Sequence, residues 1–320
     1  MPRLQYAILS IAVTIYSTTG CIQQEQPPPI PTALQAQAVL DSLIFDPAAT
    51  CTQLARRFGV TGLPIVDTPD QIGIPYEEHF IPTLDGQSLR AWHMPALEDR
   101  GLVVIAMGAA GSMACYMYTG VVLHAEGWSV VMYDFRGMGG SSGAVSAISL
   151  GDDLLTVSEW ALAQTGRSQL TLLGISLGTI PAVEVAVKRP GIVNGLILDS
   201  PVALGDEIAR FGRIAPGLTW ISDYLSEDLF SERLVGRLNQ PSLFFLHGAD
   251  RLTPPRTVQE LFDAAGGDKT LVVYPEAGHA RGVFSETESY AANLDAFLSA
   301  IWPVEPFSQI VIGQETPIAD

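Results

Sequence analysis

Six short apolar runs recur along the chain, and stretches with helical periodicity separate them. The runs do not alternate apolar with polar residues, which is typical of strands that are buried on both faces of a parallel sheet. Regular alternation of such strands with helices predicts a doubly wound, mostly parallel α/β sheet. The expected strands are 102–107, 130–134, 170–173, 196–198, 243–247 and 271–274, and the expected helices are 114–126, 150–164, 179–188, 257–265 and 286–302.

An antiparallel hairpin is expected ahead of this alternation. Two extended runs, 77–82 and 88–94, flank Leu84-Asp85-Gly86-Gln87, and an Asp-Gly pair between extended runs favours a tight turn. In a doubly wound sheet the chemistry lies at the carboxyl ends of the strands. The residues that follow each apolar run are therefore the first candidates for a functional site.

Composition excludes several classes of partner. The chain has 320 residues, of which 48% are apolar and 16% are charged, so it can bury a sizeable core. Its formal net charge is −17 and it has no basic patch, so a nucleic-acid partner is not expected. No group of cysteines and histidines has the spacing of a zinc site, and neither a metal nor another cofactor is expected.

The N-terminus carries a short apolar segment, 4–16, which is too short to span a bilayer comfortably. Small residues and a cysteine follow it in Ser17-Thr18-Thr19-Gly20-Cys21, and this site resembles a bacterial lipobox. The resemblance implies that 1–20 is a signal peptide and that Cys21 is lipidated, as in an exported, membrane-anchored lipoprotein of the bacterial envelope. Thr18 stands where an aliphatic residue is usual. An uncleaved anchor and an ordinary signal peptide are the alternatives.

Residues 201–240 carry apolar side chains at spacings of three and four, which favours short amphipathic helices. These helices either cover a pocket as a lid or pack against the core. The expected segments of the chain are a polar, Pro-rich tether at 21–38, an N-terminal extension at 39–70, the main domain at 71–302 and a C-terminal tail at 303–320.

Export is compatible with the three cysteines of the chain. If Cys21 carries lipid, Cys51 and Cys115 remain. The sequence leaves open whether these two form a disulfide or stay as free thiols.

Two segments match the pattern Gly-x-Ser-x-Gly, and their surroundings separate them. Gly174-Ile175-Ser176-Leu177-Gly178 follows one expected strand directly and precedes an expected helix. A nucleophile elbow needs both flanks, because the sharp turn between strand and helix exposes the serine oxygen. Gly139-Gly140-Ser141-Ser142-Gly143 has no evident helix behind it. We therefore expect Ser176 to be a nucleophile and Ser141 to be a loop serine.

A serine hydroxyl needs a base to accept its proton, and the base needs an acid to orient it. Of the five histidines, only His279 follows the last expected strand, in a loop at the same sheet edge as Ser176. We expect His279 to be the base. The other histidines lie in the hairpin, on a helix or at a strand end and are expected to be structural: His79, His93, His124 and His247.

Two aspartates compete for the role of the acid. Asp250 follows the strand 243–247, and Asp199 follows the strand 196–198. Asp250 is favoured over Asp199. With it the chain order is nucleophile, acid, base, which is the order of the α/β-hydrolase arrangement.

The chain from about 76 to 302 resembles an α/β-hydrolase, and within that fold it is similar to the ABHD-like and serine-aminopeptidase-like serine hydrolases. The resemblance implies a doubly wound sheet with an antiparallel N-terminal hairpin and a short helical lid at 201–240. The motifs that carry it are Gly86-Gln87-Ser88-Leu89 with Trp92, Tyr133-Asp134-Phe135-Arg136-Gly137-Met138-Gly139, the elbow at 174–178, His247-Gly248-Ala249-Asp250 and Gly278-His279.

The resemblance also implies an oxyanion hole made of two backbone N–H groups. One belongs to Leu177, and the other to Ala109 in the loop that follows the strand 102–107. Met107 stands where relatives often carry histidine, and Ala109 where many carry asparagine. Because the donor is a backbone group, neither difference removes it.

The expected activity is that of a serine hydrolase that cleaves a carboxylic ester or thioester through an acyl-enzyme, without a cofactor. An aminopeptidase or amidase of the same fold and a catalytically degenerate envelope lipoprotein are the alternatives, since the fold does not fix the substrate. The Gly-rich run 137–143 lacks the features of both phosphate-binding motifs and is not expected to bind a nucleotide. The expected partners are a small-molecule or lipidic acyl substrate and, through the lipid anchor, a membrane.

Overall fold

The computed structural model describes residues 32–62 and 64–302. The expected signal peptide 1–20, the lipidation site Cys21 and the tail 303–320 lie outside the described residues. One boundary differs from expectation. Helix α2 (Ala33–Ile44) begins inside the segment 21–38 that the composition assigns to a tether, because Ala and Gln are good helix formers and Ala36 is buried.

The predicted sheet is present, with every expected strand in place. It consists of β1 (Glu77–Pro82), β2 (Ser88–Met94), β3 (Leu102–Ala106), β4 (Ser129–Tyr133), β5 (Leu170–Ile175), β6 (Val193–Asp199), β7 (Ser242–His247) and β8 (Lys269–Tyr274).

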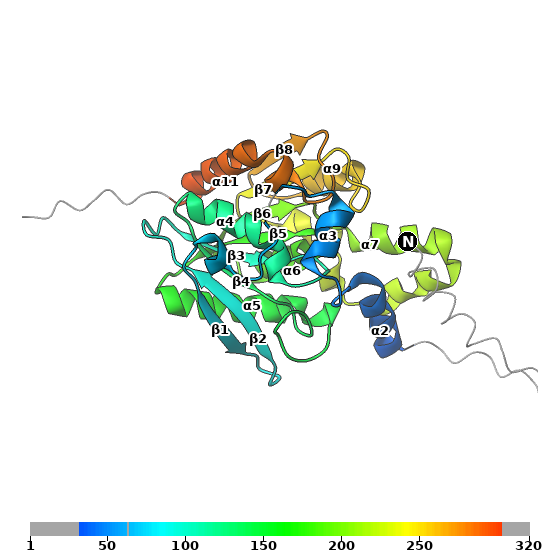
Figure 1. Cartoon of the computed structure of the whole chain (residues 1–320). Coiled ribbons are helices and arrows are strands. Elements are labelled where there is room, and N and C mark those ends of the chain that lie inside the picture. The colour runs from blue at the N-terminus through cyan, green and yellow to red at the C-terminus, as the bar shows by residue number, and fades with distance from the viewer. Residues whose placement is uncertain (1–31, 63, 303–320) are drawn as a thin grey trace, which may run out of the picture. The chain divides into compact units, whose positions relative to one another are not determined.

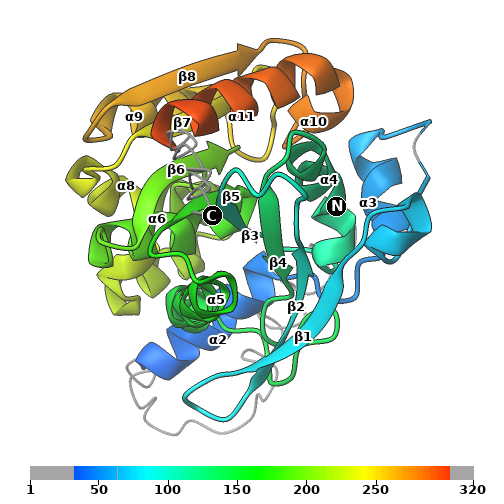
Figure 2. The same ribbon diagram turned by 90° about the vertical axis from the view of Figure 1, so that its left-hand side faces the viewer.

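The eight strands follow one another in the order β1-β2-β4-β3-β5-β6-β7-β8, which can be traced across Figure 2. β1 pairs antiparallel with β2, and β2 pairs antiparallel with β4. All further pairs are parallel. The predicted fold class, a mostly parallel doubly wound sheet with an antiparallel N-terminal hairpin, is confirmed.

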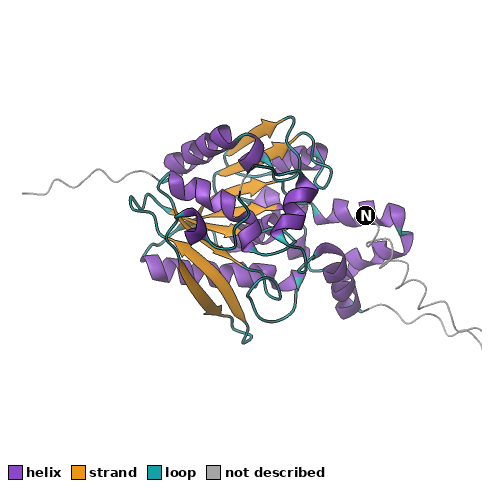
Figure 3. Ribbon diagram, in the orientation of Figure 1, coloured by secondary structure: helices purple, strands orange, loops and turns teal. Residues whose placement is uncertain are grey.

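Helices cover both faces of this sheet (Figures 1 and 3). The long helices that connect the strands agree with the expected ranges to within a few residues. They are α4 (Met117–Ala125), α5 (Leu150–Thr165), α6 (Thr179–Lys188), α9 (Pro255–Ala264) and α11 (Thr287–Ile301). α4 and α11 contact each other, and so do α5 and α6.

One strand is less buried than its sequence suggests. All residues of β3, β4, β5 and β7 are buried, as expected for strands covered on both faces. β8 was expected to be buried in the same way, but only Tyr274 at its end is, and Val273 is 49% exposed. β8 is the last strand of the sheet and pairs only with β7, so helices shield it incompletely.

The segment ahead of the hairpin packs on the domain as an extension. Besides α2 it contains α3 (Cys51–Phe58) and the 3₁₀ turn η1 (Pro69–Ile72). Thr50 and Gln53 cap α3 reciprocally, and Gly59 ends it in a left-handed conformation. The two cysteines whose state the sequence left open, Cys51 and Cys115, form a disulfide. It joins α3 to the 3₁₀ turn η2 (Met113–Tyr116), which directly precedes α4.

The expected short helices between 201 and 240 are present between β6 and β7. α7 (Leu204–Ile214) is the longest α-helix among them, and it buries Leu204, Ile208 and Gly212. The others are η5 (Pro216–Tyr224), η6 (Glu227–Leu229), α8 (Ser231–Leu234) and η7 (Val235–Arg237). Three further short helices lie next to longer elements: η3 (Ala147–Ser149), η4 (Ser176–Gly178) and α10 (Gly282–Ser285).

Candidate active site

Ser176 lies at the turn between β5 and α6. Its φ is 53°, in the left-handed region that few non-glycine residues adopt. The two glycines of the motif allow the chain to turn this sharply. A Cβ on Gly174 would lie 2.6 Å from the carbonyl oxygen of Gly178, and a Cβ on Gly178 would collide with the carbonyl oxygen of Ala106 at the end of β3. This is the geometry of a nucleophile elbow.

The three side chains predicted to form a triad meet in the structure. The Ser176 hydroxyl lies 2.8 Å from His279 Nε2, and His279 Nδ1 lies 2.8 Å from Asp250 Oδ2. They follow three different strands, β5, β7 and β8, whose carboxyl ends lie at one edge of the sheet. Asp250 is only 5% exposed, so solvent screens its contact with His279 weakly.

A tight turn after β7 holds the Asp250 carboxylate. Oδ1 accepts hydrogen bonds from the backbone N–H groups of Leu252 and Thr253, at 2.8 and 3.0 Å. The Thr253 hydroxyl donates to Oδ2 over 2.7 Å. Burial alone would raise the pKa of Asp250, but the hydrogen bonds from His279 and Thr253 outweigh it and hold that pKa below its ordinary value. Asp250 is therefore ionised and able to orient the imidazole at neutral pH.

Asp199, the competing acid, has other contacts at the end of β6. Its Oδ2 accepts a hydrogen bond from the Tyr290 hydroxyl over 2.8 Å. Its Oδ1 has no hydrogen-bond partner among the described residues and lies 3.5 Å from His247 Nδ1. Burial raises the pKa of this carboxyl. Of the two aspartates, Asp250 is the one hydrogen-bonded to His279.

Two buried side chains hold the loop that carries His279. The N–H of Ala280 donates to Ser200 Oγ over 2.9 Å, and the N–H of Gly282 donates to His247 Nε2 over 3.0 Å. Because His247 Nε2 accepts, its hydrogen is on Nδ1, which lies 3.0 Å from Ser200 Oγ. His247 is thus a buried residue that hydrogen-bonds the backbone of the loop carrying His279.

The predicted oxyanion donors lie on two adjoining segments. Leu177 follows Ser176 directly, and Gly178 packs against the carbonyl oxygens of Ala106 and Met107, where the loop toward Ala109 begins. The N–H of Ala109 has no hydrogen-bond acceptor within the described ranges 32–62 and 64–302. It is free to donate to a substrate.

The second Gly-x-Ser-x-Gly match forms a structural loop after β4. The Ser141 hydroxyl donates to the carbonyl oxygen of Asp134 over 2.7 Å, and it accepts from the N–H of Arg90 on β2 over 2.8 Å. The neighbouring Ser142 hydroxyl accepts from the N–H of Ser88. These contacts attach the loop to the hairpin.

Comparisons with known proteins bear on the fold and on the segment that carries Ser176. The family described as serine aminopeptidase, S33, matches residues 98–229. An uncharacterised protein of Mycobacterium tuberculosis is 30% identical over 203 residues, which are 62% of this chain and 70% of that protein. Human protein ABHD12B is 26% identical over 251 residues, 70% of this chain and 69% of that protein. The Pyrococcus furiosus esterase Pf2001 superposes with a TM-score of 0.63 at 21% identity, over 76% of this chain and 100% of that one.

The chain belongs to the α/β-hydrolases. The family match includes Ser176 but ends before Asp250 and His279. For these two residues the α/β-hydrolase arrangement is visible in the hydrogen bonds of the structure itself.

The helix α7 of this α/β-hydrolase is tied to the loop of the acid. Arg210 Nη1 donates to the carbonyl oxygens of Leu252 and Arg251, at 2.8 and 3.2 Å, just beyond Asp250. The same guanidinium forms an ion pair with Glu207 one turn earlier. Burial, with a smaller contribution from Asp206, raises the pKa of Glu207 to about 7, although Arg210 opposes the shift.

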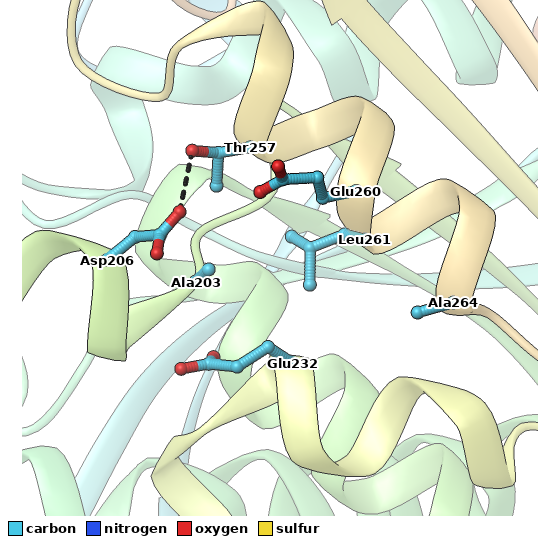
Figure 4. Close-up of a pocket in the computed structure, with 7 residues that line it drawn as sticks. All are labelled: Ala203, Asp206, Glu232, Thr257, Glu260, Leu261 and Ala264. Carbon is cyan, nitrogen blue, oxygen red and sulfur yellow. Dashed lines mark hydrogen bonds between the residues drawn. The ribbon is translucent and has the colours of Figure 1, made fainter.

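A small pocket lies between α7, α8 and α9 (Figure 4). Three carboxyl side chains line it, and Thr257 donates to one of them, Asp206, over 3.0 Å. None of its lining residues belongs to the triad: Ala203, Asp206, Glu232, Thr257, Glu260, Leu261 and Ala264.

The described part of the chain offers no candidate for a metal site or for a membrane-spanning helix. No three His, Cys, Asp or Glu side chains there are arranged to hold a metal ion. No helix there has both the length and the apolar character that crossing a bilayer requires.

Several residues that contact the triad or its loops were not identified from the sequence pattern. Thr253 could have been found, because a threonine three residues after an aspartate often closes such a turn. Phe58, Ser200 and Arg210 reach the site only through long-range packing. Phe58, on the N-terminal extension, places its ring centroid 6.0 Å from that of His279.

Proposed function

We propose that this α/β-hydrolase is a serine hydrolase that cleaves a carboxylic ester or thioester through an acyl-enzyme. One observation carries the proposal: the Ser176 hydroxyl bonds His279, which bonds Asp250, with Ser176 raised on a strained elbow. A scaffold protein has no need of all these features together. The fold alone does not identify the reaction.

The geometry supports the following steps. Ser176 Oγ attacks the carbonyl carbon while its proton moves to His279 Nε2, and Asp250 stabilises the resulting imidazolium. The N–H groups of Leu177 and Ala109 stabilise the oxyanion. His279 then gives the proton to the leaving alcohol or thiol, which departs and leaves Ser176 acylated. Water, deprotonated by His279, cleaves the acyl-enzyme and restores the serine.

An aminopeptidase or amidase is the second candidate, and the S33 serine aminopeptidase family match favours it. An aminopeptidase must also hold the ammonium group of its substrate. Glu207 on α7 is a carboxylate that interacts electrostatically with His279, but it is already paired with Arg210. A carboxylate engaged by a guanidinium is a weak ammonium site, so we favour the ester.

Fluorophosphonate labelling tests the proposal, because only an activated serine reacts with the probe. We expect the wild type to be labelled at Ser176 and to hydrolyse p-nitrophenyl esters, with aminoacyl p-nitroanilides cleaved far more slowly. Preference for the anilides would make the protein an aminopeptidase. An unlabelled protein without activity on either class would support the degenerate binding lipoprotein.

We further propose that the enzyme is exported and anchored through a lipidated Cys21. The disulfide between Cys51 and Cys115 supports export, since disulfides persist mainly in oxidising compartments. A membrane-anchored hydrolase would meet lipidic or envelope-derived acyl substrates. No cofactor is required for the reaction.

A further inference from the structure

The N-terminal extension reaches the active site through a stretch that we name the wall segment, residues 46–59. It precedes residues 98–229, which the family match covers. At one end the N–H of Asp46 donates to the carbonyl oxygen of Ala109 over 2.9 Å, and the N–H of Gly111 donates to the carbonyl oxygen of Asp46 over 3.0 Å. The wall segment is thus attached to the loop that carries a predicted oxyanion donor.

The middle of the wall segment is fixed covalently and by packing. Cys51 is bonded to Cys115, and Leu54 is only 7% exposed. The wall segment packs closely against the loop that contains Gly111. A Cβ on Gly111 would lie 2.8 Å from Cys115 Sγ and 3.2 Å from Leu54 Cδ1. α3 therefore holds a defined position beside the site.

The far end of the wall segment lies against the catalytic loop. The Phe58 ring and the His279 imidazole have centroids 6.0 Å apart, with their planes inclined by 38°. Arg281, two residues after His279, donates through Nη2 to the carbonyl oxygen of Gly59 over 3.1 Å. The Arg57 guanidinium lies 5.7 Å from the centroid of the Phe58 ring. Phe58 is only half-buried, so part of its ring is open to a ligand.

The chemistry of the triad indicates which part of a substrate lies next to His279. After attack by Ser176, His279 must give its proton to the oxygen or sulfur of the leaving group, which therefore lies within hydrogen-bond reach of the imidazole. Phe58 packs against that imidazole, which makes it a candidate contact of the leaving group. The acyl group, by contrast, stays bonded to Ser176 after the leaving group has departed.

We propose that Phe58 is a specificity-determining residue whose ring contacts the leaving group and selects esters of apolar alcohols. The proposal rests on the serine hydrolase function proposed above. An aromatic ring offers an apolar surface to an alkyl chain, and burying methylene groups against it stabilises the bound substrate. Lengthening the alcohol from methyl to butyl should thus raise kcat/KM in the wild type.

The test compares methyl and butyl butyrate, which share an acyl group and differ in the alcohol. In Phe58→Ala we expect the butyl-to-methyl ratio of kcat/KM to fall by about tenfold or more, in the range found for an apolar contact in a specificity pocket. Phe58→Leu, which keeps an apolar surface, should retain most of the ratio. Thr52→Ala, at an exposed position of the same helix, is the matched control and should leave it unchanged.

A second readout separates a contact with the leaving group from a general structural effect. Deacylation begins after the alcohol has left, and methyl and butyl butyrate form the same butyryl-enzyme. Its rate in pre-steady-state kinetics should therefore change in Phe58→Ala by much less than the butyl-to-methyl ratio, and by the same factor for both esters. The preference between acetyl and hexanoyl esters of one alcohol should also be unchanged. A deacylation rate or acyl preference that changes as much as the alcohol preference would overturn the proposal.

Failure of this proposal is distinguishable from failure of the proposed function. If fluorophosphonate labels Ser176 but the butyl-to-methyl ratio does not change in Phe58→Ala, only the role of Phe58 is overturned. If the wild type is neither labelled nor active on esters, both proposals fall. Labelling of Phe58→Ala at the wild-type rate shows that the variant is folded at its active site, because the leaving group of the probe is fluoride and not an alcohol.

Discussion

The hydroxyl of Thr253 donates to Asp250 Oδ2 over 2.7 Å, and this is the same oxygen that accepts from His279 Nδ1. Thr253 Oγ1 also lies 3.3 Å from His279 Nδ1. These hydrogen bonds hold the carboxylate beside the imidazole, and those from His279 and Thr253 keep its pKa below the ordinary value. Among the described residues, Asp199 has no comparable set of donors.

This difference predicts the outcome of two substitutions. Asp250→Asn should lower kcat by about 10⁴-fold, because an amide at this place favours the wrong tautomer of His279. Asp199→Asn should leave kcat within about tenfold, since Asp199 bonds Tyr290. Steady-state kinetics on a p-nitrophenyl ester measures both. A larger loss of kcat for Asp199→Asn than for Asp250→Asn would identify Asp199, at the end of β6, as the acid.

The two serine motifs give a second matched pair. Ser176→Ala should remove the nucleophile and lower kcat by about 10⁴–10⁶-fold, with residual activity arising from binding and the oxyanion hole. Ser141→Ala should leave kcat within about threefold, although the loss of its bonds to Asp134 and Arg90 should lower the unfolding temperature slightly. Inactivity of Ser141→Ala in a folded protein would contradict the assignment of the elbow.

Much of this site could be predicted because its catalytic residues come soon after apolar runs in the sequence. The sequence around Ser176, Asp250 and His279 places each residue directly after an expected strand, and parallel strands bring such positions to one edge. The partial exposure of β8 could not be predicted, because an apolar run does not indicate whether its strand lies at the edge of a sheet. Phe58 could not be predicted, since its contact with His279 joins positions far apart in the chain and depends on how α3 packs.

Glu207 gives the protein a specific pH dependence of stability. Its pKa is raised from 4.5 to about 7 in the folded protein by burial. Between these values the folded state holds a proton that the unfolded chain has lost, so this group makes the free energy of unfolding fall as pH rises from about 4.5 to about 7. Replacing the carboxyl removes this dependence.

Glu207→Gln should therefore gain stability relative to the wild type as pH rises from 5 to 8. The gain should be a few degrees in unfolding temperature, since about 1 kcal/mol corresponds to roughly 2 °C in a domain of this size. Glu260→Gln is the control, because Glu260 is an exposed carboxyl in an ion pair with Arg256. Parallel melting curves of Glu207→Gln and wild type across this pH range would contradict the assignment.

Anchoring of the enzyme is tested at Cys21, which lies outside the described residues. In a bacterial host the wild type should lose residues 1–20 and carry lipid on Cys21, because Gly20-Cys21 follows a short apolar segment and precedes a polar, Pro-rich one. Several acyl chains, each contributing about 0.8 kcal/mol per buried methylene, anchor a protein stably without a spanning helix. Cys21→Ser should move the protein from the detergent phase to the aqueous phase, while its esterase activity in detergent stays within about twofold of the wild type, because the triad lies far from this residue in sequence. Mass spectrometry that finds Met1 intact in the wild type, or equal partitioning of the two proteins, would falsify the lipoprotein proposal and leave the hydrolase proposal standing.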